Sequence, residues 1–139
     1  MSVSMKYHYD ISGDFSRAGE ASGDLKNKLK QMSVRSDVIR KVAIAMYEGE
    51  INMVIHAGGG EIDAEITPDC VTMVLRDEGP GIADIDKAMT AGYSTASENI
   101  RSLGFGAGMG LPNMKTYTDE MDIVSAPGQG TVITMRVLM

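Results

Sequence analysis

The feature of this sequence that most constrains its fold is a glycine-rich stretch over residues 77–110, which lies between two segments with regular periodicity. Apart from a possible short helix over 84–90, the stretch has the period of neither a helix nor a strand. A connection of this length without regular structure is usually functional. We therefore take it as the first candidate for a binding site.

The segments before this stretch have clear periods. Apolar residues at every second position predict a strand over 3–11, and spacings of three and four predict a helix over 14–32 with Asp14 as its N-cap. A second helix is expected over 36–57, where three consecutive glycines stop it. The stripe expected to face the core from this helix consists of Val38, Val42, Ala45, Met46, Gly49 and Met53.

The period of two then returns. The remaining expected elements are strands over 62–66 and 71–75 joined by a turn at 67–69, a helix over 108–117, a strand over 121–125, a turn at 127–130 and a strand over 131–138. Strands joined by tight turns, with helices grouped between them, predict a two-layer α/β sandwich. We expect a single domain over 1–139, in which helices cover one face of a mixed, mostly antiparallel sheet.

The composition excludes several classes of protein. With 43% hydrophobic and 23% charged residues, the chain resembles ordinary globular proteins. A net charge of −6 disfavours direct binding to nucleic acid. Because no apolar run approaches the length of a membrane span and the N-terminus lacks the pattern of a signal peptide, we expect a cytoplasmic protein without membrane contact. The lone Cys70 is expected to be structural.

A polar row is expected on the second helix. Glu48, Asn52 and His56 are spaced four apart and share one face, whereas Glu50 points to the other side. A carboxylate can orient a hydroxyl group as a base, and an amide oxygen can bind Mg²⁺. A solvated helix face has the same pattern, and His56 is then an ordinary histidine at a helix end.

Two glycine motifs follow. Asp77, Gly79 and Gly81 come directly after an apolar strand, where glycine lets the backbone approach a flat ligand and Asp77 can accept a hydrogen bond from an exocyclic amine. A plain turn opened by Asp77 is the alternative.

Further on, four alternating glycines over 104–110 lead into a helix, and their N–H groups can bind phosphate oxygens. The spacing fits neither the dinucleotide fingerprint nor the P-loop, so a different nucleotide pocket is needed.

In this order, the motifs resemble the N, G1 and G2 boxes and the terminal Gly-Thr of the GHKL ATPases, which include gyrase, histidine kinases and MutL. The matching residues are Glu48, Asn52, Asp77, Gly79, Gly81, the glycines over 104–110, Gly130 and Thr131. The closest resemblance is to the stand-alone bacterial anti-sigma factors and stress-response switch serine kinases, because the chain has about the length of one such domain. The resemblance covers nearly the whole chain.

The resemblance implies a Bergerat-type pocket for ATP and Mg²⁺. In this pocket Glu48 is the general base and Asn52 holds Mg²⁺, while Asp77 bonds the adenine amine with support from Thr131. Gly79, Gly81 and Ile82 shape the adenine edge. The implied phosphate lid consists of Gly104, Gly106, Ala107, Gly108, Met109, Gly110 and Leu111, with 91–103 as its mobile part.

Two functions follow from this resemblance. One is a serine/threonine protein kinase that phosphorylates a small regulatory partner with a STAS-type domain, an anti-sigma-factor antagonist, and Glu48 favours it. The other is an ATP-gated module that sequesters a sigma factor or regulator without significant phosphotransfer. The catalytic half of a histidine kinase is less expected, since His8 falls in a strand. A homodimer paired through the first strand, which contains Tyr7 and Tyr9, stays open.

Overall fold

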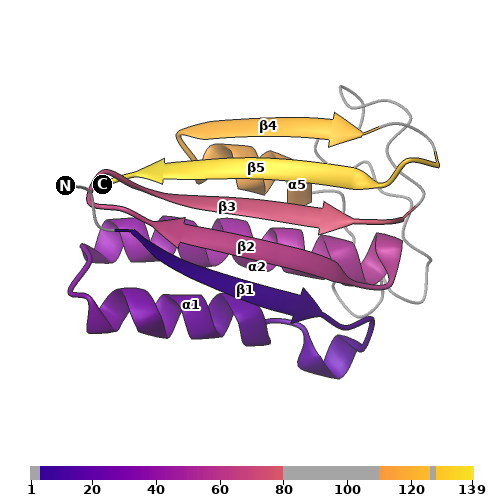
Figure 1. The fold of residues 1–139 in the computed structure, drawn as a ribbon, viewed down its shortest axis with the longest axis horizontal. Helices are drawn as coiled ribbons and strands as arrows, with labels where there is room; N and C mark the ends of the chain where they lie inside the picture. The colour runs from indigo at the N-terminus through magenta and orange to yellow at the C-terminus, as the bar shows by residue number, and fades with distance from the viewer. Residues whose placement is uncertain (1–3, 80–109, 126–127) are drawn as a thin grey trace.

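The computed structural model describes residues 4–79, 110–125 and 128–139. It has two layers, a five-stranded sheet and a layer of helices that covers one of its faces (Figure 1). The strand order is β1-β2-β3-β5-β4, and every described pair of neighbours is antiparallel. The predicted two-layer α/β sandwich is therefore confirmed. The sheet was expected to be mixed and mostly antiparallel, whereas the described strands are all antiparallel to their neighbours.

The described strands are β1 (Met5–Ile11), β2 (Gly60–Ile66), β3 (Cys70–Asp77), β4 (Glu120–Ser125) and β5 (Thr131–Leu138). The described helices are the 3-10 turn η1 (Phe15–Arg17), α1 (Glu20–Gln31), α2 (Ser36–Ala57) and α5 (Gly110–Thr116). The helix predicted over 84–90 lies outside the described residues. No helix among the residues described here is long and apolar enough to span a lipid bilayer.

The core lies between the two layers, because every second residue of the central strands faces the helices. The buried strand residues are Ile62, Ala64, Ile66, Val71, Met73, Leu75, Ile133, Met135 and Val137. They meet the predicted stripe of α2, all of which is buried. The second helix also ends where predicted, at Gly58, which adopts the left-handed conformation with a φ of 70°.

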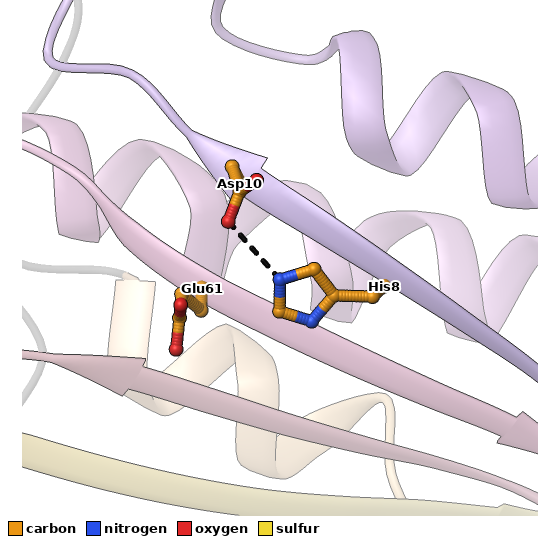
Figure 2. A group of neighbouring side chains, drawn as sticks. All are labelled: His8, Asp10 and Glu61. Atoms are coloured by element: carbon orange, nitrogen blue, oxygen red, sulfur yellow. Dashed lines mark hydrogen bonds and ion pairs between the residues drawn. The ribbon is translucent and has the colours of Figure 1, made fainter.

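The outer face of the sheet, away from the helices, carries a network of ion pairs. His8, Asp10 and Glu61 lie there with ligand atoms within 4.8 Å of one another (Figure 2). His8 Nδ1 is 2.7 Å from Asp63 Oδ1, and Nε2 is 3.0 Å from Asp10 Oδ1. Two hydrogen bonds raise the pKa of His8 above its usual value, and the bond to Asp63 has a larger effect than the bond to Asp10. Arg76 also pairs with Asp63. Exposed pairs of this kind contribute little to stability, and we assign them no catalytic role.

The first helical segment differs from the prediction. Phe15–Arg17 forms a separate 3-10 turn, and Gly19 adopts a φ of 97° before α1 begins at Glu20. Asp14 caps the short turn, since its Oδ1 accepts a hydrogen bond from the N–H group of Ser16 at 2.9 Å. The single helix predicted from Asp14 is therefore wrong, because the backbone breaks at a glycine that tolerates positive φ.

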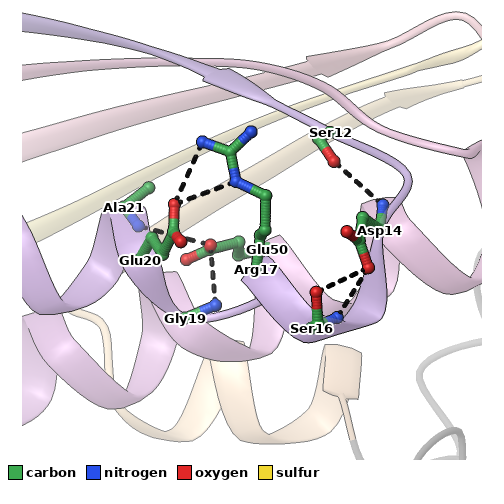
Figure 3. Close-up of polar contacts among 8 residues, drawn as sticks. All are labelled: Ser12, Asp14, Ser16, Arg17, Gly19, Glu20, Ala21 and Glu50. Atoms are coloured by element: carbon green, nitrogen blue, oxygen red, sulfur yellow. Dashed lines mark hydrogen bonds and ion pairs between the residues drawn. The ribbon is translucent and has the colours of Figure 1, made fainter.

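The start of α1 is held by a carboxylate from α2 (Figure 3). The side chain of Glu50 is 2% exposed. It accepts hydrogen bonds from the backbone N–H groups of Gly19, Ala21 and Ser22 at 2.8, 3.3 and 3.0 Å. The first N–H groups of a helix have no partner within the helix, and together they form the positive end of its dipole. Glu50 is thus a buried cap for α1, which confirms that it points away from the polar row of α2.

Gly49 lies where α2, β3 and α5 meet. A Cβ atom built on Gly49 would overlap the side chain of Leu75 and lie 3.4 Å from Met114 Sδ. Both side chains belong to the buried core. The glycine beside Glu48 is therefore explained by close packing.

Replacing Gly49 with alanine is expected to lower the free energy of unfolding by about 1–2 kcal/mol, because overpacking outweighs the better helix propensity of alanine. Gly23 is the matched control, since it lies inside α1 and a Cβ there would have no neighbour within 4 Å. Gly23→Ala is expected to stabilise by about 0.5–1 kcal/mol. Urea unfolding measures both, and equal gains for the two variants would contradict the packing argument.

Candidate functional site

At one end of the sheet, the helix-facing side changes from apolar to polar. Asp77 ends β3 two residues after the buried Leu75, Thr131 begins β5 directly opposite Asp77, and Ser125 ends β4 directly opposite Thr131. Because side chains alternate along a strand, all three face the helix layer. Three neighbouring strands therefore present oxygen atoms at the place where the core ends.

The C-terminal half of α2 forms the second wall of this site. Figure 1 shows the end of α2 at the same end of the sandwich as the end of β3 and the start of β5. Glu48, Asn52 and His56 are each partly buried along this half. Burial lowers the pKa of His56, while the charge of Asp77 acts in the opposite direction. Ala57, the residue after His56, lies against Gly79, so the row on α2 approaches the end of β3 at His56.

Two glycines allow the backbone around Asp77 to pack closely. The N–H group of Gly79 donates a hydrogen bond to Asp77 Oδ1 at 2.9 Å. A Cβ on Gly79 would lie 2.6 Å from the Cβ of Ala57, at the end of α2. A Cβ on Gly130, whose φ is 74°, would overlap the carbonyl oxygen of Asp77. The segment after β3 is thus fixed against both α2 and the turn before β5.

The helix α5 adds a residue that the sequence analysis did not single out. The side-chain amide of Asn113 donates a hydrogen bond to Glu48 Oε1 at 3.3 Å. Asn113 follows Gly110 by three residues, about one helical turn, and no local pattern of the sequence indicates its contact with Glu48. Leu111, which the resemblance placed in the lid, is 7% exposed and packs in the core. The contact connects α5 directly to the polar row of α2.

Of the predicted site residues, Asp77 and Thr131 stand opposite each other, Gly79 bonds to Asp77, and Glu48 and Asn52 are partly buried along α2. Gly110 begins α5. The predicted residues Gly81, Ile82, Gly104, Gly106, Ala107, Gly108 and Met109, and the segment 91–103, lie outside the described residues. The described part thus offers one carboxylate and one amide along α2, and an edge of the sheet rich in hydrogen-bond acceptors near the end of that helix.

Comparison with known proteins agrees with this geometry. Residues 12–137 match the family described as "Histidine kinase-like ATPase domain". An anti-sigma F factor from Caldanaerobacter subterraneus is 34% identical over 110 residues, which cover 76% of this chain and 73% of that protein. The serine/threonine-protein kinase RsbT of Bacillus subtilis is 32% identical over 112 residues, 78% of each chain. The predicted resemblance to GHKL ATPases of the anti-sigma factor and switch-kinase type is therefore confirmed.

A solved structure shares the fold. The mycobacterial sensor histidine kinase MprB superposes with a TM-score of 0.54 over 96% of this chain and 97% of that one. The two sequences are 17% identical, so the likeness concerns the fold alone.

Proposed function

Since the chain belongs to the family of histidine kinase-like ATPase domains, we propose that it binds ATP with Mg²⁺ at the polar end of the sandwich. The observation that carries this proposal is the cross-strand pair of Asp77 and Thr131, which faces the helix layer where α2 ends. A pair of oxygen acceptors at the end of a buried strand suits a base with an exocyclic amine.

Asp77 has one oxygen to offer to the base. Its Oδ1 already accepts the N–H group of Gly79 at 2.9 Å, which fixes the plane of the carboxylate. Oδ2 then accepts a hydrogen bond from the adenine amine. Thr131 supports this contact, directly or through a water molecule, from the neighbouring strand. Gly79 lets the backbone that follows Asp77 pack against the end of α2, because a Cβ there would lie 2.6 Å from the Cβ of Ala57.

The phosphates extend along α2 towards α5. There Asn52 would hold Mg²⁺ through its amide oxygen, and Glu48 would orient the hydroxyl group that attacks the phosphate. Asn113 holds the Glu48 carboxylate through its hydrogen bond at 3.3 Å. The glycines over 104–110, which apart from Gly110 lie outside the described residues, are proposed to offer backbone N–H groups to the phosphate oxygens. Phosphoryl transfer depends mainly on positioning and charge neutralisation, and these groups provide both.

The partner is proposed from the relatives. One is named a serine/threonine-protein kinase and others are named anti-sigma F factor. We propose that this chain is a serine/threonine protein kinase acting on a small STAS-type regulator. The second candidate is an ATP-gated module that sequesters a sigma factor or regulator, which the anti-sigma names favour. A homodimer paired through β1 and a cytoplasmic location stay predictions.

Calorimetric titration with ATP and ADP, each with and without Mg²⁺, tests the pocket. We expect micromolar binding that strengthens with Mg²⁺, because Asn52 would help to hold the metal beside the phosphates. In Asn52→Ala, binding without Mg²⁺ is expected to persist while the gain from Mg²⁺ is lost. An absence of nucleotide binding by the unaltered chain would contradict the proposed function.

A further inference from the structure

We propose that Ser125 is a positioning residue for base recognition in the nucleotide site proposed above, on which this inference rests. By fixing the hydroxyl group of Thr131 as a hydrogen-bond acceptor, Ser125 makes the site select a purine with an amino group at position 6 over one with a carbonyl group there. The hydroxyl groups of Ser125 and Thr131 have one hydrogen atom each to donate.

The hydrogen bonds of Ser125 determine the direction of the Thr131 hydroxyl. Ser125 Oγ lies 2.8 Å from the carbonyl oxygen of Gly130 and 2.8 Å from Thr131 Oγ1. A carbonyl oxygen can only accept, and a serine hydroxyl has a single hydrogen to donate. Ser125 therefore donates to Gly130, and Thr131 donates to Ser125. Thr131 Oγ1 then has no hydrogen left to donate to a ligand and can only accept further hydrogen bonds.

These lone pairs lie beside another group that only accepts. Asp77 stands directly opposite Thr131 in the pairing of β3 with β5. The Cβ atoms of residues paired in this way are about 4.5–5.5 Å apart. An ionised carboxylate also has no hydrogen to donate. The base thus meets two neighbouring acceptors, which match the two hydrogens of an amine and oppose a carbonyl oxygen.

Burial makes the direction of this hydroxyl important. Thr131 is 7% exposed, so water compensates poorly for a mismatched contact. A site built to pair a polar group rejects analogues that cannot pair with it. Without the Ser125 hydroxyl, Thr131 is free to rotate and donate to a carbonyl at position 6. Loss of Ser125 therefore alters the choice of base, whereas a purely structural residue would weaken both nucleotides equally.

The test compares ATP with inosine triphosphate, which carries a carbonyl group at position 6. Calorimetry on the full chain measures both dissociation constants for the unaltered protein, Ser125→Ala and Ser125→Thr. In Ser125→Ala, ATP is expected to bind about 3- to 10-fold more weakly, the range expected for one hydrogen bond. Inosine triphosphate is expected to bind as before or more tightly, so the preference for ATP falls. Ser125→Thr keeps the hydroxyl and is expected to restore the preference.

Thr134→Val is the matched control, because it removes a hydroxyl from the outer face of the same strand β5, and the ratio of the two constants is expected to stay unchanged. If Ser125→Ala weakens both nucleotides by the same factor, the role in selectivity is refuted while the nucleotide site stands. If the unaltered chain binds neither nucleotide, the proposed function fails and this inference fails with it.

Discussion

Replacing Glu50 with alanine is expected to lower the free energy of unfolding by about 3–5 kcal/mol, because several backbone N–H groups lose a charged acceptor at once. The carboxylate is 2% exposed and accepts three backbone N–H groups at the start of α1. Alanine would leave these buried donors without a partner, and each unsatisfied donor costs about 1–3 kcal/mol. Equilibrium unfolding in urea, followed by circular dichroism, measures the loss.

Two further variants separate capping from a general effect of charge. Glu50→Gln keeps one acceptor oxygen but loses the negative charge, so an intermediate loss is expected. Glu20→Ala, in the same turn of α1, removes a carboxylate that pairs with Arg17 while both side chains are 62% exposed. Its loss is expected to stay below about 1 kcal/mol, as for other exposed ion pairs. A similar small loss in Glu50→Ala would show that α1 does not need this cap.

The same contact explains which part of the fold the sequence could predict. Local signals predicted α2 well, because its apolar stripe and its terminal glycine both lie within the segment itself. The start of α1 depends on Glu50, which is 31 residues from Gly19 along the chain. Apolar spacing alone made the region from Asp14 look like one continuous helix. A cap supplied by a distant side chain leaves no local pattern, so the break at Gly19 could not be predicted.

The candidate site shows the same difference between local sequence signals and contacts of distant residues. The resemblance linked Asp77 and Thr131 through a shared ligand, and the register of β3 and β5 places the two residues opposite each other. The contact of Asn113 with Glu48 and the link of Ser125 to Thr131 depend on side chains that meet across elements. Their identity alone carried no signal. The sequence therefore provides candidates for contact with the ligand, whereas the side chains that orient these candidates are found only in the structure.

Replacing Asp77 with asparagine is expected to weaken ATP binding by about 100-fold, because a charged hydrogen bond is lost and a repulsive contact replaces it. Oδ1 of Asp77 accepts the N–H group of Gly79 at 2.9 Å. In the variant, the single amide oxygen takes over this contact. The amide nitrogen then faces the adenine amine, and two donors meet. Because the bond to Gly79 survives, the free energy of unfolding is expected to change little.

The matched control for Asp77→Asn is Asp119→Asn. Asp119 Oδ2 accepts the backbone N–H group of Leu138 at 2.7 Å, so the chemical change is the same. Leu138 pairs with Cys70 at the start of β3, whereas Asp77 is at its end, so Asp119 lies at the opposite end of the sheet from the site. Asp119→Asn is expected to bind ATP like the unaltered chain in the same titration. If Asp77→Asn also binds ATP unchanged while the unaltered chain binds it tightly, the base must be recognised elsewhere, since no other change in that variant could restore the lost acceptor.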